Sequence, residues 1–190
     1  MSARSGRLVV GISGASGAIY GVRLLRALQV LDVETHLVIT GPAHVTLTQE
    51  MDLAPADVRA YATHAYDPED LAAPLASGSF ATDGMVVAPC SIKTLSAIAN
   101  SYTDNLLVRA ADVTLKEGRP LILLVRETPL HLGHLRLMVR AAEMGALIFP
   151  PLPAFYGRPT TIEALVDQTI GRVLARLGFQ NDLYTVWQGS

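Results

Sequence analysis

Gly11-Ile-Ser-Gly-Ala-Ser-Gly17 is the strongest indication of the fold class in this sequence. It follows the apolar run Leu8-Val9-Val10 and precedes a helical pattern that begins near Ile19, so it has the position of a strand-to-helix turn. Small residues in a strand-to-helix turn let backbone N–H groups and the positive end of a helix dipole approach a ligand closely. A dinucleotide-binding turn has glycine at its first, third and sixth positions, but Ser13 and Ser16 stand at the third and sixth here. The turn therefore predicts a site for a phosphate or a flavin.

Outward from this turn, apolar runs alternate with helical patterns, which is typical of βαβ units in a parallel sheet. We predict strands at residues 8–12, 35–39, 85–88, 121–125 and 146–149, and a weaker one at 62–66. We predict helices at about 18–30, 42–52, 92–100, 103–116, 131–144 and 161–177. The expected fold class is α/β: one Rossmann-like domain over residues 1–190, with a doubly wound, mostly parallel sheet and helices on both faces. We expect the tail, about 179–190, to pack on a neighbouring subunit.

The composition limits the class of protein. Half of the 190 residues are hydrophobic and 17% are charged, which favours buried parallel strands, a large subunit interface, or both. The net charge is -2 and the cations are scattered, so we expect no nucleic acid partner. The sequence contains no run of about 18 apolar residues, so we expect no membrane span. Cys90 is the only cysteine, which fits a reducing compartment, and we expect a cytoplasmic protein.

Polar side chains follow the predicted strands, at the edge where doubly wound sheets bind ligands. Thr40 follows the second strand, where a nicotinamide-binding protein carries an acidic residue for the ribose. Residues 89–94 follow the third strand and indicate either a helix cap or a phosphate-binding segment at the start of a helix. Arg126-Glu127 follows the fourth strand, where the two charged residues either face the ligand crevice or form an ion pair at the edge of the sheet. Thr40 in place of an acidic residue disfavours an NAD-binding protein, and the absence of a GxxxxGK[ST] motif disfavours a P-loop nucleotide hydrolase.

For the cysteine, the histidines and four of the cations, the sequence is compatible with a structural role as well as a functional one. Cys90 has no histidine near it in sequence and is more typical of a small buried hydrophobe than of a nucleophile. The histidines lack a metal-binding spacing with carboxylates, and His131 and His134 indicate a partly exposed helix face, so no metal is expected. Four cations are either solvated or placed to bind a phosphate ester: Arg109, Lys116, Arg126 and Arg172.

Six segments resemble, in order and spacing, the UbiX-like flavin prenyltransferases, and the resemblance runs from about residue 8 to Trp187. The segments are Gly11 to Gly21, Ala76 to Ser79, Pro89 to Ser96, Asn105 to Lys116, Arg126-Glu127 and Phe155-Tyr156. The resemblance implies a homododecamer that binds reduced FMN and dimethylallyl monophosphate. It implies that the dimethylallyl group is joined to N5 and then C6 of the flavin without a metal. The prenylated FMN would serve a UbiD-type decarboxylase.

The same resemblance assigns roles to individual residues. Catalytic roles fall on Ser16, Glu50 and Glu127. The flavin-lining positions are Ser13, Gly14, Ala15, Ser16, Thr40, Ser91, Thr94, Arg109 and Arg126. The prenyl-substrate positions are Ser77, Gly78, Lys116, Arg126, Tyr156, Arg172 and Trp187. Cations around the phosphate agree with the chemistry, because ionisation of an allylic phosphate leaves a dianion beside a carbocation.

Two other functions compete with prenyl transfer. One is an FMN-dependent cysteine decarboxylase, which the chain resembles through Ala97-Ile-Ala-Asn100 and Asp104-Asn-Leu-Leu107. Those enzymes carry a Pro-Ala-Ser-Ala-Asn-Thr type motif where this chain has Pro89-Cys-Ser-Ile-Lys-Thr94, and they use a catalytic histidine that has no counterpart here. The other is a flavin-binding or carrier subunit without catalysis, which would not need Glu127 or the phosphate-binding cations.

Overall fold

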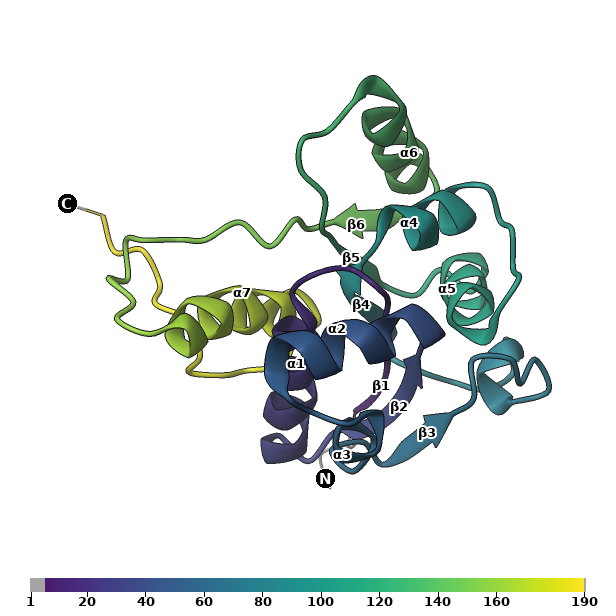
Figure 1. Cartoon of the computed structure of the whole chain (residues 1–190), viewed down its shortest axis with the longest axis horizontal. Helices are drawn as coiled ribbons and strands as arrows, with labels where there is room; N and C mark the ends of the chain where they lie inside the picture. Colours follow the sequence, from purple (N-terminus) through teal and green to yellow (C-terminus); the bar gives the residue numbers. More distant parts are fainter. Residues whose placement is uncertain (1–5, 190) are drawn as a thin grey trace. The chain divides into compact units, whose positions relative to one another are not determined.

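The computed structural model describes residues 6–189 (Figure 1). These residues fall into two compact units, one ending at Pro150 and the other beginning at Pro151. Among residues 6–189, no helix is both long and apolar enough to cross a membrane.

A six-stranded parallel sheet forms the centre of the first unit, counted over the described part of the chain. Its order is β3-β2-β1-β4-β5-β6. The strands are β1 (Arg7–Ile12), β2 (Glu34–Ile39), β3 (His64–Tyr66), β4 (Gly84–Cys90), β5 (Leu121–Val125) and β6 (Ala146–Ile148). Every residue of β4 and β5 is buried, as expected for central parallel strands covered on both faces. The chain reverses its direction of winding between β1 and β4, which is where doubly wound sheets bind ligands.

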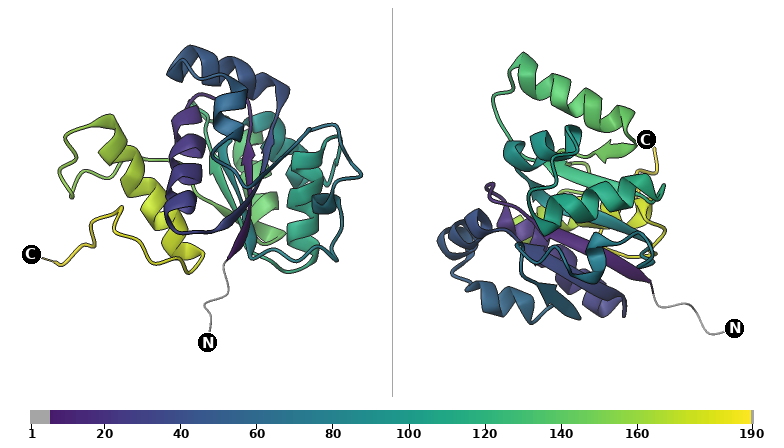
Figure 2. Two further views of the ribbon diagram at one scale, coloured as in Figure 1. Left: turned by 90° about the horizontal axis from the view of Figure 1, so that it is seen from below. Right: turned by 90° about the vertical axis from the view of Figure 1, so that its right-hand side faces the viewer.

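Helices lie on both faces of this sheet. In Figure 2, α1 (Ala18–Val30) and α5 (Leu106–Lys116) lie on opposite faces. Helix α1 contacts β1, β2 and β4, and α5 contacts β2, β4 and β5. The other helices of this unit are α2 (Gly41–Met51), α3 (Pro55–Arg59), α4 (Ile92–Ala99) and α6 (Leu132–Glu143), with a 3-10 turn, η1, at Pro74–Ala76. The predicted Rossmann-like fold class is confirmed.

The second unit contains α7 (Ile162–Arg176) and the segments on either side of it. Thr161 caps α7, because its hydroxyl accepts a hydrogen bond from the Ala164 N–H at 3.1 Å. Gly178 follows the helix with φ +85°, the left-handed conformation that ends many helices. The sequence predicted both ends of this helix to within one residue.

Among the α-helices, the structure departs from the prediction by more than one residue in two places. Helix α5 begins at Leu106 and not at residue 103, because the Asn105 side chain accepts a hydrogen bond from the Val108 N–H and caps the helix there. The short helix α3 was not predicted; it begins at Pro55 and is too short to show an apolar period. Neither difference changes the sheet.

Candidate functional site

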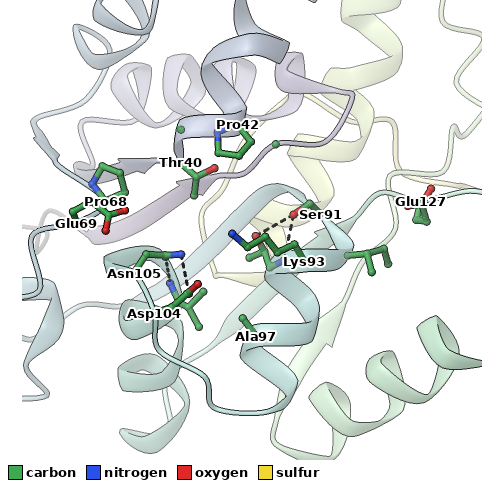
Figure 3. A pocket seen from close by; sticks show the side chains of 15 residues that line it. Thr40, Pro42, Pro68, Glu69, Ser91, Lys93, Ala97, Asp104, Asn105 and Glu127 are labelled. Carbon is green, nitrogen blue, oxygen red and sulfur yellow. Dashed lines mark hydrogen bonds between the residues drawn. The ribbon is translucent and has the colours of Figure 1, made fainter.

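A cavity of about 330 Å³ lies at the carboxyl ends of the strands. The residues that line it come from the segments after β1, β2, β3, β4 and β5, together with the start of α5. They are Gly14, Thr40, Gly41, Pro42, Pro68, Glu69, Ser91, Ile92, Lys93, Thr94, Ala97, Asp104, Asn105, Val108 and Glu127. In Figure 3, Glu127 and Glu69 lie at opposite ends of the cavity, with Lys93 between them. The volume is in the usual range for a cofactor site.

Gly14 is the residue of the first turn that lines this cavity. A Cβ at this position would lie 2.4 Å from Pro42 Cβ, so any side chain here would displace the start of α2. Two backbone segments, one after β1 and one after β2, therefore meet closely at the cavity wall. This is the close approach that the small residues of the first turn predicted.

Ser13 ties the first turn to the segment after β4. Its buried hydroxyl donates to the Pro89 carbonyl and accepts from the Ser91 N–H, both at 2.8 Å. The hydroxyl is thus satisfied within the protein and fixes the relative position of two ligand-binding segments. Its predicted role in lining the flavin stays a prediction.

The N-terminus of α4 opens into the cavity. Ser91 caps it: its hydroxyl accepts from the Thr94 N–H at 3.2 Å and donates to the Thr94 hydroxyl at 3.1 Å. The first N–H groups of a helix have no partner within the helix, and the dipole there favours negative charge. Lys93 also lines the cavity and adds a formal positive charge. The expected helix cap is confirmed, and the same groups form a site suited to a phosphate.

The N-terminus of α1 has a different partner. Glu50 accepts hydrogen bonds from the N–H groups of Gly17 and Ala18, at 2.8 and 3.1 Å. The first turn was expected to offer its helix N–H groups to a phosphate, but here a carboxylate receives them. Ser16 lies exposed in the same turn, and Ala15 is partly buried beside it. Of the two helix N-termini, the one at Ser91 is therefore better suited to an external anion.

The segment after β5 places Glu127 in the cavity wall. One carboxylate oxygen of Glu127 accepts from the Thr128 N–H at 2.9 Å, and the Arg126 N–H donates to the Cys90 carbonyl at 3.0 Å. Both side chains, Arg126 and Glu127, are exposed. Cys90 is fully buried, and burial raises the pKa of its thiol, so it lacks the thiolate that a nucleophile needs.

Other predicted residues of the first unit lie along α5. Gly78 lies against the side chains of Lys116 and Glu117, which form an ion pair. Arg109 donates to the Ala76 carbonyl at 3.1 Å and pairs with Asp112 at 2.9 Å. The Ser77 hydroxyl is hydrogen-bonded to the Ser79 hydroxyl at 2.8 Å. The structure brings these residues together, but none of them is among the residues that line the cavity.

Tyr156, Arg172 and Trp187 belong to the second unit. The rings of Tyr156 and Trp187 meet edge to face, with centroids 5.8 Å apart. The Tyr156 hydroxyl accepts from the side-chain amide of Gln168 at 2.9 Å. Arg172 lies four residues after Gln168, on the same face of α7, and is exposed.

Sequence reasoning missed several residues of the cavity wall. Lys93 stood inside a recognised motif, and a cation in a helix-capping segment is a signal that could have identified it. Asn105 could have been found as a helix cap. Pro68 and Glu69 gave no signal, because a loop after the edge strand β3 reaches the cavity only through the tertiary fold.

A second polar cluster lies at the amino half of β2 and β3. The carboxylate of Glu34 pairs with Arg7 at 3.0 Å, with His36 at 2.9 Å and with His64 at 3.8 Å. The Arg7 guanidinium lowers the pKa of Glu34, and burial lowers the pKa of His36. Within residues 6–189, Glu34, His36 and His64 are the group whose ligand atoms approach within 4.8 Å. His36 is hydrogen-bonded to Glu34 and to the Tyr66 hydroxyl. The expectation that the protein uses no metal stays a prediction.

Comparisons with known proteins agree with this geometry. The sequence pattern of the Flavoprotein family matches residues 2–174. The flavin prenyltransferase UbiX of Escherichia coli K12 is 59% identical over 97% of this chain and 99% of its own length. The crystal structure of AnUbiX (PadA1) with FMN and dimethylallyl pyrophosphate has a TM-score of 0.96 at 48% identity, covering 98% of this chain and 100% of that one. A structure described as a dodecameric FMN-dependent UbiX-like decarboxylase from Escherichia coli O157:H7 has a TM-score of 0.94 at 47% identity, covering 96% and 100%.

The competing cysteine decarboxylase function has weaker support. The FMN-dependent cysteine decarboxylase SpaF is 18% identical, with a TM-score of 0.63 over 76% of this chain and 83% of that one. At that identity the likeness extends to the fold alone.

Proposed function

This chain belongs to the UbiX family of flavin prenyltransferases, and from that premise we propose how its own residues bind the two substrates and promote the transfer. The protein is an enzyme, a prenyl transferase that acts on FMN and produces prenylated FMN. The donor that we propose is dimethylallyl monophosphate. The observation that carries the residue-level proposal is the cavity at the strand ends, which joins an anion-binding helix terminus to a carboxylate.

We propose that FMN binds in this cavity. Its phosphate would lie at the N-terminus of α4, held by Ser91, Thr94, the free N–H groups of the helix and Lys93. The ring system would lie along Gly14 and Thr40, where no side chain on Gly14 intrudes. Arg126 and Arg109 would complete the flavin site, with Ser13 fixing the two loops that face the ring.

The prenyl phosphate needs donors and positive charge. Lys116, Arg126, Arg172 and the Tyr156 hydroxyl supply them, and Trp187 supplies an apolar aromatic surface for the allyl group. Breaking the allylic C–O bond develops charge on the phosphate, and fixed cations stabilise that charge as it forms. We propose that these protein cations take the place of a metal. Ser77 and Gly78 would border the same substrate.

We propose that Glu127 and Ser16 transfer protons during the reaction. When bound, reduced FMN supplies the nucleophilic N5 and C6 positions that receive the prenyl group. We propose that the Glu127 carboxylate, at the cavity wall, exchanges the proton that must leave the flavin, while the exposed Ser16 hydroxyl donates toward the departing phosphate. Glu50 would orient this turn by holding the N–H groups of Gly17 and Ala18.

More than one copy of the chain is needed to complete the site. Asn105 lines the cavity at one end of α5, and Lys116 lies at the other end, about 16 Å away along a helix of 11 residues. Lys116 is accordingly not among the residues that line the cavity of its own subunit. We propose that a neighbouring subunit supplies Lys116, in a homododecamer like the one described for the relative from Escherichia coli O157:H7.

Three further proposals follow from the family. The product would pass to a UbiD-type decarboxylase, and the enzyme would be cytoplasmic. The two compact units would act as a single domain, and the tail from about residue 179, which contacts α7 and Tyr156 of its own chain through Asn181, Thr185 and Trp187, would also contact a neighbouring subunit. Trp187 in that tail would then stand beside a site formed by several copies of the chain.

Anaerobic incubation with reduced FMN and dimethylallyl monophosphate tests the proposed function. Mass spectrometry should detect FMN that has gained one dimethylallyl group, together with release of phosphate. A parallel reaction contains a peptide with a carboxyl-terminal cysteine and oxidised FMN. Unmodified flavin in the first reaction and decarboxylated peptide in the second would show that the competing function is correct.

A further inference from the structure

Gln168 lies on the buried face of α7, where it is 6% exposed. A buried side-chain amide is costly unless its donors and its acceptor are all paired. Its partners are the Tyr156 hydroxyl and the backbone of Thr185, which come from the two segments that flank α7. Gln168 thus connects the loop before the helix with the tail after it.

The Thr185 backbone fixes the orientation of the amide. The Thr185 N–H is only a donor, and it lies 2.8 Å from Gln168 Oε1. The Thr185 carbonyl is only an acceptor, and it lies 3.3 Å from Gln168 Nε2. A flipped amide would place donor against donor and acceptor against acceptor, so a single orientation satisfies both contacts.

This orientation determines the direction of the hydrogen bond to Tyr156. The second N–H of Gln168 Nε2 points to the Tyr156 hydroxyl, whose oxygen lies 2.9 Å away and must act as the acceptor. Among residues 6–189, Gln168 is the hydrogen-bond partner found for that hydroxyl. The Tyr156 O–H proton is therefore left to donate to another group. Arg172, one turn further along the same face of α7, is also a donor, so the two together favour an anion.

We propose that Gln168 is a positioning residue that keeps the Tyr156 hydroxyl as a donor toward the phosphate of the prenyl substrate. Through Thr185 it also holds the tail, so that Trp187 stays against the Tyr156 ring. This inference rests on the proposed function, because that function makes the phosphate the ligand of Tyr156. Gln168 itself does not contact the substrate.

Two substitutions separate the parts of this arrangement. Gln168→Met keeps the length of the side chain and removes all three hydrogen bonds. Gln168→Glu keeps the acceptor for the Thr185 N–H but replaces the donor to Tyr156 by an acceptor, which would draw the Tyr156 proton inward. Gln29→Met is the matched control, because Gln29 is an exposed residue of α1 and lies outside both the proposed site and the tail.

Both variants should raise the KM for dimethylallyl monophosphate roughly tenfold or more, the size expected when a hydrogen bond to a charged group is lost. The kcat at saturating substrate and the affinity for FMN should stay near the values of the unmodified enzyme. In Gln29→Met the KM, the kcat and the affinity for FMN should all stay near those values. In a Tyr156→Phe background, Gln168→Met should give little further change, because the two residues act through one hydroxyl. An unchanged KM in both folded Gln168 variants would overturn the positioning role.

Trp187 provides a readout that does not depend on catalysis, because it is the only tryptophan of the chain. Gln168→Met should shift its fluorescence emission and increase its mobility, since the bonds to Thr185 are lost. A shifted emission with an unchanged KM would show that Gln168 serves only to hold the tail, and would overturn the proposal. If the unmodified enzyme forms no prenylated flavin, the proposed function is wrong, and so is the role of Gln168 toward the phosphate. If only the emission of Trp187 is unchanged in Gln168→Met, the connection between Gln168 and the tail is wrong.

Discussion

Gly14 shows how a single residue constrains the cavity. It lies where the turn after β1 meets Pro42 at the start of α2, and a Cβ there would lie 2.4 Å from Pro42 Cβ. Gly41, in the same cavity wall, has nothing within 4 Å of the corresponding position. The two glycines therefore differ in packing, although both are neighbours of the proposed flavin ring.

Gly14→Ala should lower the free energy of unfolding by about 1–3 kcal/mol, because the methyl group forces a backbone shift at a packed contact. It should also weaken FMN binding, since the displaced turn faces the ring. Thermal unfolding and quenching of flavin fluorescence measure the two effects. Gly41→Ala, the matched control for stability, should unfold within about 0.5 kcal/mol of the unmodified protein. Equal stability of the two variants would contradict the contact with Pro42.

The N-termini of helices α1 and α4 lie at the same edge of the sheet but have different hydrogen-bond partners. Both follow a strand of the central sheet, α1 after the turn at residues 13–17 and α4 after Ser91, at the edge that holds the cavity. Glu50 receives the first N–H groups of α1, whereas Ser91 caps α4 and leaves its first N–H groups facing the cavity. The negative charge of Glu50 disfavours a second anion at α1, which supports the proposal that the flavin phosphate binds at α4.

Glu50→Ala should destabilise the protein by about 0.5–1 kcal/mol, the usual cost of losing a helix cap. Glu50→Gln keeps an oxygen acceptor for the Gly17 and Ala18 N–H groups, so it should retain most of that stability. If Glu50 also takes part in proton or phosphate handling, Glu50→Gln should slow turnover well beyond its small effect on the melting temperature. Full turnover in a stable Glu50→Gln enzyme would leave helix capping as the function of this carboxylate.

The same elements show what the sequence could and could not predict. Helix α1 and the central strands follow from apolar period and small-residue turns, which are local signals, and their predicted bounds agree closely with the structure. Glu50 was assigned to catalysis, but its contact with the first turn joins residues 33 positions apart and has no local signal. Pro68 and Glu69 reach the cavity for the same reason: they depend on where β3 pairs, at the sheet edge next to β2.

At the scale of the whole molecule, α5 sets the distance between two groups of predicted site residues. Asn105 and the cavity lie at its first turn, and Lys116 with Gly78 lies at its last. A straight helix of this length does not bring its two ends to one ligand. The sequence placed Lys116 and Glu127 in one site because the resemblance does not distinguish residues of one subunit from those of its neighbour.

Mixed oligomers test whether neighbouring subunits share the site. Lys116→Ala and Glu127→Gln should each reduce prenylated FMN formation severely, because one removes a phosphate cation and the other a proton-transferring group. Oligomers that contain both variants in equal amounts should regain about a quarter of the active sites, since some sites then combine an intact Glu127 with an intact Lys116 from another copy. Co-expression with two affinity tags isolates the mixed species, and oligomers of each variant alone are the controls. Mixed oligomers no more active than these controls would mean that Lys116 does not act across a subunit boundary.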